Sequence, residues 1–239
     1  MGKILNIETS TRVCSVALAF DGEVAVMQES VVENSHARHI TVFAEEVIYR
    51  AGITFKELDA IAVSKGPGSY TGLRIGVSTA KGFCYSLDKP LISVGTLRSL
   101  ANGMIAKFKN EGKNPDDYLF CPMIDARRME VYSAVYDSSL NEVRKIEAEV
   151  IDEKSFGDLF EKGKRLVFMG DGAQKCKDIL SEASGNAVFP QEFLASAAYM
   201  APLAEKKLQQ NDFEDTAYFE PFYLKDFIAG IPRVKGLRD

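Results

Sequence analysis

The order of the predicted elements repeats along the chain, and this repeat restricts the fold more than any other feature of the sequence. Each half contains three strands and then a helix, a strand, a helix, a strand and a helix. In the first half we expect strands at residues 4–9, 13–20, 23–32, 60–64 and 91–94, and helices at 35–50, 71–87 and 96–107. In the second half we expect strands at 118–124, 130–136, 142–150, 166–169 and 187–189, and helices at 155–161, 174–182 and 195–210. A polar, turn-rich stretch at residues 110–117 separates the halves and predicts a domain boundary.

This duplicated order predicts an α/β fold made of two ribonuclease-H-like lobes, each based on a βββαβα unit. Actin, Hsp70 chaperones and sugar kinases share that architecture. Residues 1–109 would form the N-terminal lobe and residues 110–239 the C-terminal lobe, whose last segment can pack back on the first lobe. Proteins of this fold normally bind ATP between their lobes, so the candidate phosphate-binding loops decide the functional interpretation.

The composition limits the classes of function. The chain has 239 residues, 46% of them apolar, which is enough for a sizeable core. Its formal net charge of -5 argues against a broad basic face that grips nucleic acid without a partner. The four cysteines form no CxxC pair, so we expect reduced thiols in a cytoplasmic protein. We recognise neither a signal peptide nor a membrane-spanning run, and expect no contact with membranes.

A glycine-proline loop follows the strand at residues 60–64 and leads directly into a helix. Gly66 and Gly68 permit backbone angles that other residues resist. This position suits a phosphate-binding loop. A Walker A loop, however, needs a lysine after its last glycine, where Leu73 stands here, and the third glycine of a dinucleotide fingerprint comes one residue late, at Gly72. We therefore interpret the loop as a tight turn between a strand and a helix.

The turn after the first strand also departs from an ATP site. ATP-binding members of the fold place an aspartate at the end of this strand and glycine in the turn. Glu8 occupies the aspartate position, and the turn at residues 9–12 contains no glycine, so its backbone is less free to approach a phosphate. Residues 170–172, a second candidate phosphate loop, are equally typical of an ordinary turn.

The two histidines are the remaining candidates for metal binding or acid–base chemistry. His36 and His39 stand three residues apart on a predicted helix and so share a face. A zinc or iron site would need a third ligand, and the HxxH spacing is a weak pattern. Ordinary polar positions near a helix start are the favoured interpretation.

The helix at residues 71–87 carries small residues at every fourth position. Each internal glycine costs about 1 kcal/mol relative to alanine, and close approach of another helix is a compensating reason. The helix at residues 35–50 offers an apolar companion face. We predict a partner interface on these two helices, although packing against the chain's own sheet must account for some of their apolar residues. The predicted interface residues are Ile40, Phe43, Val47, Gly72, Leu73, Gly76, Val77, Ala80 and Phe83.

Five stretches of the sequence resemble the TsaB family. They lie at residues 4–10, 65–77, 93–97, 125–132 and 170–172, and the resemblance spans nearly the whole chain. The stretch at residues 65–77, KGPGSYTGLRIGV, is the most specific of them. TsaB proteins are dimerisation subunits of the bacterial machinery that makes threonylcarbamoyladenosine beside the tRNA anticodon.

The resemblance implies a scaffold that is not itself an enzyme. The paralogue TsaD would hold the catalytic role, the ATPase TsaE would join the complex, and tRNA would be contacted only through the complex. The two helices would form a four-helix bundle with TsaD or with a second copy of this chain. TsaD carries a metal-binding His-x3-His pair, which the spacing of His36 and His39 does not match. We therefore expect no catalytic, cofactor-binding or metal-binding residues here.

Two alternatives remain open on the residues alone. A metallopeptidase-like (glycoprotease) protein would need His36 and His39 as metal ligands. An ATP-dependent enzyme of the sugar-kinase fold would need a nucleotide between the lobes and a catalytic base such as Asp125 or Asp171.

Overall fold

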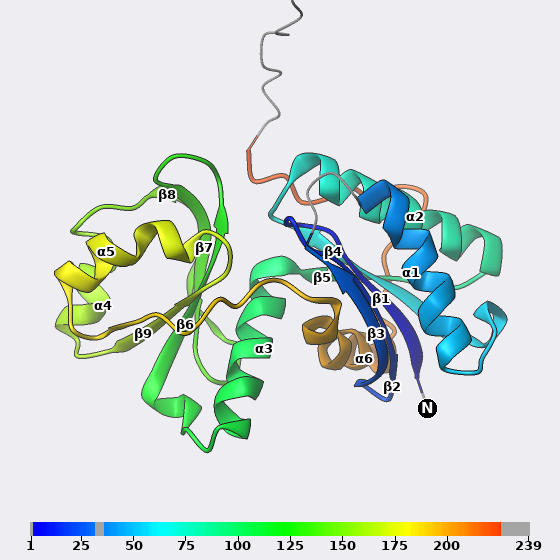
Figure 1. The fold of residues 1–239 in the computed structure, drawn as a ribbon, viewed down its shortest axis with the longest axis horizontal. Helices are drawn as coiled ribbons and strands as arrows, with labels where there is room; N and C mark the ends of the chain where they lie inside the picture. The colour runs from blue at the N-terminus through cyan, green and yellow to red at the C-terminus, as the bar shows by residue number, and fades with distance from the viewer. Residues whose placement is uncertain (1, 32–35, 226–239) are drawn as a thin grey trace, which may run out of the picture.

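The computed structural model describes residues 2–31 and 36–225 and contains two five-stranded sheets with the same strand order (Figure 1). The first sheet has the order β3-β2-β1-β4-β5, and the second has the corresponding order β8-β7-β6-β9-β10. The first half of the chain forms β1 (Lys3–Glu8), β2 (Cys14–Phe20), β3 (Glu23–Ser30), α1 (His36–Arg50), β4 (Ala60–Gly66), α2 (Tyr70–Leu87), β5 (Leu91–Gly95) and α3 (Thr96–Asn110). The second half forms β6 (Tyr118–Asp125), β7 (Glu130–Tyr136), β8 (Glu142–Val150), α4 (Gly157–Glu161), β9 (Arg165–Met169), α5 (Ala173–Ala183), β10 (Ala187–Val188) and α6 (Ala201–Gln210). The predicted fold class, with two lobes of equivalent architecture, is confirmed.

The first strand of each lobe lies at the centre of its sheet, with an antiparallel neighbour on one side and a parallel neighbour on the other. β1 is antiparallel to β2 and parallel to β4, and β6 is antiparallel to β7 and parallel to β9. A parallel strand covered on both faces needs a nearly continuous apolar run, which β4 supplies with its buried residues 60–63. The tight turn between β2 and β3 uses Asp21 and Gly22, both with positive φ, as the Asp-Gly signal predicts.

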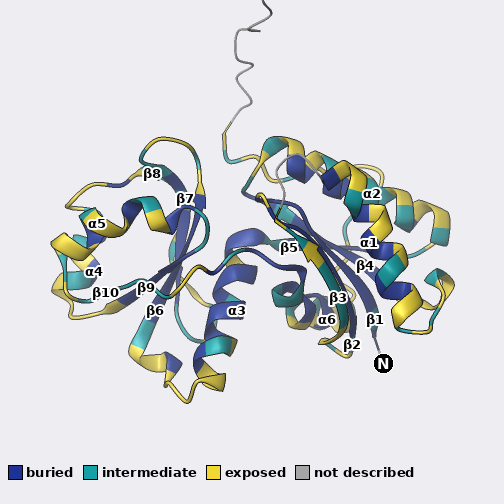
Figure 2. Ribbon diagram, viewed as in Figure 1, coloured by how far each residue is buried: buried dark blue, intermediate teal, exposed yellow. Residues whose placement is uncertain are grey.

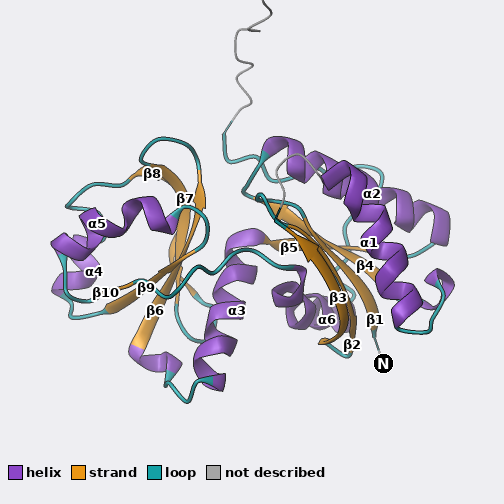
Figure 3. Cartoon of the chain, in the orientation of Figure 1, coloured by secondary structure: helices purple, strands orange, loops and turns teal. Residues whose placement is uncertain are grey.

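Each sheet is covered by helices on both faces (Figure 3). The apolar faces of α1 and α2 pack on one side of the first sheet. On its other side pack Met200, which directly precedes α6, and Ala204 of α6. On the second sheet, α4 and α5 cover one face and α3 covers the other. The helices α3 and α6 therefore lie between the two sheets, and their buried residues form the middle of the molecule (Figures 1 and 2).

The contacts of α3 and α6 cross the predicted division at residues 109 and 110. Although α3 belongs to the first half of the sequence, its residues Leu97, Leu100 and Met104 join the core of the second sheet. In return, α6 from the second half joins the core of the first sheet. The division into lobes at residues 1–109 and 110–239, with a last segment that can pack back on the first lobe, stays a prediction. Residues 226–239, which the predicted C-terminal lobe includes, lie outside the described residues.

Most of the local differences between the predicted and the observed elements lie at the residues where helices begin. The helix expected at 195–210 is a short 3-10 turn, Ala197–Met200, followed by α6, in which Pro202 occupies the first turn where its missing N–H costs nothing. The helix expected from residue 155 begins at Gly157, because Phe156 adopts a left-handed conformation with φ of 64°. The predicted start of α1 at residue 35 lies outside the described residues. Among the described helices, none is both long enough and apolar enough to cross a bilayer.

The position of α6 generates a prediction about stability. We expect Met200→Ala to lower the free energy of unfolding by about 2–5 kcal/mol, because it opens a cavity between the first sheet and the segment that covers it. Urea denaturation followed by circular dichroism measures the change. Lys206→Ala, on the exposed side of α6, is the control and should change the stability by less than about 0.5 kcal/mol. Equal effects of the two substitutions would contradict the packing of α6 on the first sheet.

Candidate functional site

The glycine-proline loop is pressed onto the turn between β1 and β2. The backbone N–H of Ser69 donates a hydrogen bond of 2.6 Å to the carbonyl oxygen of Ser10. A side chain at Gly68 would overlap the same carbonyl group. The glycines of this loop are therefore needed to bring two segments of the chain together, as expected for a tight turn. Pro67, Gly68 and Ser69 of the same loop also line the cleft between the lobes.

The small residues of α2 face the same turn. The hydroxyl of Thr9 donates a hydrogen bond of 2.8 Å to the carbonyl oxygen of Gly72, and a Cβ at Gly72 or Gly76 would overlap Thr9. The glycine stripe therefore allows close contact between α2 and the end of β1. The group that approaches Gly72 and Gly76 closely in the structure is thus Thr9 of the same chain, and the place of these glycines in a partner interface stays a prediction.

The other predicted interface residues are mostly part of the core. Ile40, Phe43 and Val47 on α1 are buried against the first sheet. On α2, Leu73, Val77 and Ala80 are also buried, and Phe83 is half-buried, with its ring stacked on Phe55 at a centroid distance of 5.4 Å. The structure thus brings the predicted residues together, but on the inward faces of the two helices.

The outward faces of α1 and α2 carry apolar residues that the sequence interpretation missed. Val42, Tyr49 and Tyr85 have exposed fractions of 54%, 85% and 90%. A Cβ at Gly82 would meet no atom within 4 Å, so this glycine also lies on the open side. A spacing of seven residues puts Val42 and Tyr49 on one face of α1, and this was the available signal in the sequence. We call the surface formed by Val42, Tyr49, Gly82 and Tyr85 the outer helical face.

The second lobe repeats the arrangement of the first. Gly170 adopts a φ of 103°, and a side chain there would overlap the carbonyl oxygen of Met123 at the end of β6. A Cβ at Gly172 would lie 2.9 Å from the carbonyl carbon of Ile124. In both lobes, the loop after the parallel neighbour of the first strand uses its glycines to pack on that first strand.

Two ion pairs border a cleft of about 970 Å³ that is lined by residues of both halves of the chain. Arg12, from the turn after β1, pairs with Glu192 of the second half of the chain. On the other side, Lys225 pairs with Glu130 at the start of β7. These residues are more than 90 positions apart in sequence, so no local pattern predicts their contact.

The carboxylates proposed for the kinase alternative serve as structural acceptors. Asp125 pairs with Lys175, and its side chain accepts a hydrogen bond of 2.9 Å from the N–H of Arg127. Asp171 accepts the N–H of Asp125 at 3.0 Å. Burial raises the pKa of Asp171, an effect opposed by that hydrogen bond and by the charge of Arg12 across the cleft.

Glu8 at the end of β1 is fully buried. One of its carboxyl oxygens accepts a hydrogen bond of 2.6 Å from the N–H of Ser10, and the other has no hydrogen-bond partner among the described residues. Loss of hydration raises the pKa of Glu8 above its ordinary value, while hydrogen bonds from Ser10 and Ser64 act in the opposite direction.

The side chain of His36 forms hydrogen bonds with the turn between β1 and β2. Its Nε2 atom lies 2.9 Å from the carbonyl oxygen of Thr11 and 3.2 Å from that of Val13, so this nitrogen acts as a donor. The ring of His39 instead packs on Phe43 at a centroid distance of 5.2 Å. Within residues 2–31 and 36–225, no group of three or more histidine, cysteine, aspartate or glutamate side chains is arranged to hold a metal ion.

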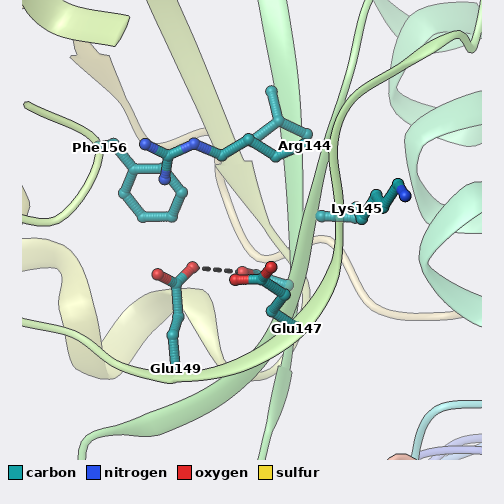
Figure 4. Close-up of a pocket in the computed structure, with 8 residues that line it drawn as sticks. Arg144, Lys145, Glu147, Glu149 and Phe156 are labelled. Carbon is teal, nitrogen blue, oxygen red and sulfur yellow. Dashed lines mark hydrogen bonds between the residues drawn. The ribbon is translucent and has the colours of Figure 1, made fainter. Parts of the chain in front are cut away.

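A smaller pocket of about 230 Å³ lies beside β7 and β8 (Figure 4). Arg144 extends over the ring of Phe156 and pairs with Asp158. Glu149 accepts a hydrogen bond of 2.5 Å from the hydroxyl of Ser133. Since these polar groups already have partners within the lobe, we assign the pocket no functional role.

Comparison with known proteins agrees with this architecture. The chain is 32% identical to the tRNA threonylcarbamoyladenosine biosynthesis protein TsaB of Escherichia coli K12 over 231 residues, which cover 95% of this chain and 96% of that protein. It is 28% identical to the TsaB of Bacillus subtilis 168 over 201 residues, covering 83% and 82% of the two chains. A family model described as TsaD, tRNA N6-adenosine threonylcarbamoyltransferase, matches residues 28–233. The threonylcarbamoyltransferase of Clostridium perfringens SM101 is 33% identical over 163 residues, covering 67% of this chain and 45% of that enzyme.

Solved structures share the fold. YeaZ from Pseudomonas aeruginosa superposes with a TM-score of 0.75 at 23% identity, covering 94% of this chain and 100% of that one. The activator of 2-hydroxyisocaproyl-CoA dehydratase from Clostridium difficile superposes with a TM-score of 0.52 at 7% identity, covering 89% and 98% of the two chains.

The two sheets of equal strand order and the packed glycine loops define a two-lobed α/β protein whose loops contact its own strands. Within that class, the chain belongs to the TsaB family.

The contact between α2 and Thr9 predicts opposite effects for two glycines of one helix. We expect Gly76→Ala to destabilise the protein by about 1–3 kcal/mol, because its methyl group would collide with the Thr9 hydroxyl. Gly82→Ala, with no atom nearby, should stabilise the helix by up to about 1 kcal/mol. Urea denaturation of both variants tests this pair of predictions.

A double-mutant cycle shows whether alanine at position 76 destabilises the protein by colliding with Thr9 or for some other reason. Thr9→Ala removes the oxygen that the new methyl group would meet. The double variant Thr9→Ala/Gly76→Ala should therefore lose less stability than the sum of its single substitutions. If the stability losses of the two single substitutions simply add in the double variant, contact with Thr9 is not the reason that position 76 requires glycine.

The buried carboxyl group of Glu8 predicts a pH dependence. Since the pKa of Glu8 is raised in the folded state, the folded protein keeps a proton that the unfolded chain releases above about pH 4.5. The unfolded state then binds fewer protons, and the free energy of unfolding falls as pH rises through the raised pKa. We expect Glu8→Gln, which remains neutral, to gain stability relative to the wild type over this interval.

Urea denaturation at a series of pH values measures that gain. Glu182→Gln, on the exposed side of α5, is the matched control and should follow the wild-type curve. A constant difference between Glu8→Gln and the wild type at every pH would contradict the prediction.

Proposed function

We propose that this chain is a non-catalytic, cytoplasmic subunit that dimerises with the threonylcarbamoyltransferase TsaD for tRNA N6-threonylcarbamoyladenosine modification. It would act as a scaffold and activator of TsaD. TsaE would join through the complex, and tRNA would be contacted only through it. Curated relatives named for threonylcarbamoyladenosine biosynthesis support this proposal, and they match nearly the whole chain.

The outer helical face is the observation that carries the proposal. Tyr49 and Tyr85 have the highest exposed fractions among the large apolar and aromatic residues of the described chain, and both lie on the α1–α2 layer. Tyrosine is enriched at protein interfaces because it buries a large area while losing little side-chain entropy. An exposed layer of this kind fits a protein partner better than it fits solvent.

The partner's own fold favours pairing through equivalent helices. The chain is similar in sequence both to TsaB proteins and to threonylcarbamoyltransferases, so such an enzyme is expected to carry a helix pair equivalent to α1 and α2. Two like layers related by a pseudo-twofold axis can pack as a four-helix bundle. A second copy of this chain is the other occupant that this geometry permits.

The cleft supports a scaffold more than an enzyme. The glycines of both candidate phosphate loops pack against the chain's own strands. Lys175 pairs with Asp125, and the Nε2 atom of His36 lies between two carbonyl groups. Either alternative, kinase or metallopeptidase, would first have to break these internal contacts.

Substitution of the outer helical face tests the docking surface. We expect Tyr49→Ala and Tyr85→Ala each to weaken the complex with TsaD of the same organism about tenfold or more, since central interface tyrosines contribute about 1.4 kcal/mol or more. Isothermal titration calorimetry gives the dissociation constant, and the mass of the complex follows from light scattering.

Val150→Ala is the control for that experiment, because Val150 is an exposed apolar residue on the edge strand β8 of the other lobe. It should leave the affinity unchanged. The proposed surface is wrong if all three variants bind TsaD as the wild type does while retaining their melting temperatures.

Reconstitution tests the scaffold role itself. TsaD and TsaE would be assayed for modified tRNA with and without this chain, and we expect modification to require it. Full modification without the chain would reject the function. Loss of modification in Tyr85→Ala together with loss of binding would connect the role to the outer helical face.

A further inference from the structure

The turn between β6 and β7, residues 126–129, holds two adjacent arginines in an unfavourable backbone conformation. Arg127 has a φ of 73° and Arg128 a φ of 49°. Left-handed angles are unfavourable for residues other than glycine, and such strain is concentrated at functional sites. The turn is nevertheless closed by two backbone hydrogen bonds of 3.1 Å, from Ala126 to the carbonyl of Glu130 and from Glu130 to the carbonyl of Arg127. We call residues 126–129 the arginine turn.

The two guanidinium groups of the arginine turn have no counter-charge in the described chain. Both side chains are exposed, and neither guanidinium forms an ion pair or a hydrogen bond within residues 2–31 and 36–225. The neighbouring carboxylates are already engaged: Asp125 pairs with Lys175, and Glu130 pairs with Lys225. Asp171 accepts the N–H of Asp125. Two adjacent positive charges are therefore available to an anion from outside this part of the chain.

Exposed aromatic rings border the same cleft as the arginine turn. Phe222 and Tyr223 line this cleft together with Arg127, and their exposed fractions are 40% and 37%. Tyr223 stands two residues before Lys225, which pairs with Glu130 at the end of the arginine turn. That ion pair brings the aromatic rings and the arginines into one region of the cleft, although about 95 positions separate them in the sequence.

Unpaired RNA is the ligand class that uses both features. A guanidinium group can donate two parallel hydrogen bonds to phosphate oxygens, so adjacent arginines suit a phosphate backbone. Unpaired RNA also exposes bases, which stack on aromatic side chains. An acidic peptide would use the charges of the arginine turn but not the aromatic rings beside it.

We propose that the arginine turn and the ring of Tyr223 contact an unpaired segment of the tRNA. Arg127 and Arg128 bind its phosphates, and Tyr223 stacks on one of its bases. The inference rests on the proposed function, because two phosphate contacts on a chain with a net charge of -5 are too few to hold tRNA alone. The contact therefore forms in the complex with TsaD, where it adds to the affinity for tRNA.

Binding of fluorescently labelled tRNA to the complex of TsaD with the full chain tests the phosphate contacts. We expect Arg127→Ala/Arg128→Ala to weaken binding roughly 10–30-fold at about 0.1 M salt and to reduce the slope of log K against log salt by roughly 1.4, the value for two contacts to unpaired RNA. Lys162→Ala/Lys164→Ala, which removes two exposed cations beside α4, is the matched control and should behave as the wild type does. Arg127→Lys/Arg128→Lys keeps both charges and should restore the slope.

The stacking contact has a different signature. We expect Tyr223→Ala to weaken tRNA binding roughly fivefold or more without changing the salt slope, because it removes a ring and no charge. Tyr218→Ala removes an exposed tyrosine that does not line the cleft, and it should bind tRNA as the wild type does.

Light scattering and melting temperatures show whether each variant is folded and bound to TsaD. The proposal is overturned, and the proposed function stands, if the complex forms but the arginine variant binds tRNA with wild-type affinity and slope. It is also overturned if the arginine substitutions weaken binding to TsaD instead, because the turn would then contact protein. Loss of ATP binding by the isolated chain, with tRNA binding unchanged, would assign the arginines to a free nucleotide. A wild-type chain that does not bind TsaD would reject both the inference and the proposed function.

Discussion

The contact of Thr9 with the first turns of α2 determines how the rest of the first lobe is arranged. It joins the end of the central strand β1 to a helix that starts more than 60 residues later. Side chains at positions 72 and 76 would keep the two segments apart, so the glycines are required for this approach. The same approach brings the glycine-proline loop onto Ser10. One contact thus joins the glycine-proline loop, which lines the cleft, to the turn after β1.

The second lobe shows that this arrangement belongs to the duplicated unit. Gly170 and Gly172 approach β6 as Gly68 and Gly72 approach the turn after β1, although the two halves have little residue-level similarity. What the halves share is a strand order and a need for close packing at one end of the central strand. The ion pairs from Arg12 and Lys225 are different, because they join residues that lie far apart in the sequence.

The sequence predicted the order and type of most elements because alternation and turn residues act locally. It also predicted the family, through stretches such as residues 65–77. It could not show which neighbour Gly72 and Gly76 approach, since a sheet and a partner helix both require small residues at that spacing. It missed Tyr49 and Tyr85, because an exposed aromatic residue does not disturb the apolar face on which the helix prediction rests. Contacts such as Arg12 with Glu192 depend on how the lobes sit together, and no local pattern encodes them.

The positions of α3 and α6 between the sheets have a consequence for the order in which the protein can fold during synthesis. The first sheet is complete once β5 has been made, but the helix that covers its inner face is encoded roughly 110 residues later. At about 5–20 residues per second, the ribosome would need roughly 6–22 s to supply that helix. Until then, apolar residues of β1, β4 and β5 stay uncovered on that face. The two lobes must therefore reach their final structure together, near the end of translation, and the nascent chain is a candidate for protection by chaperones during that interval.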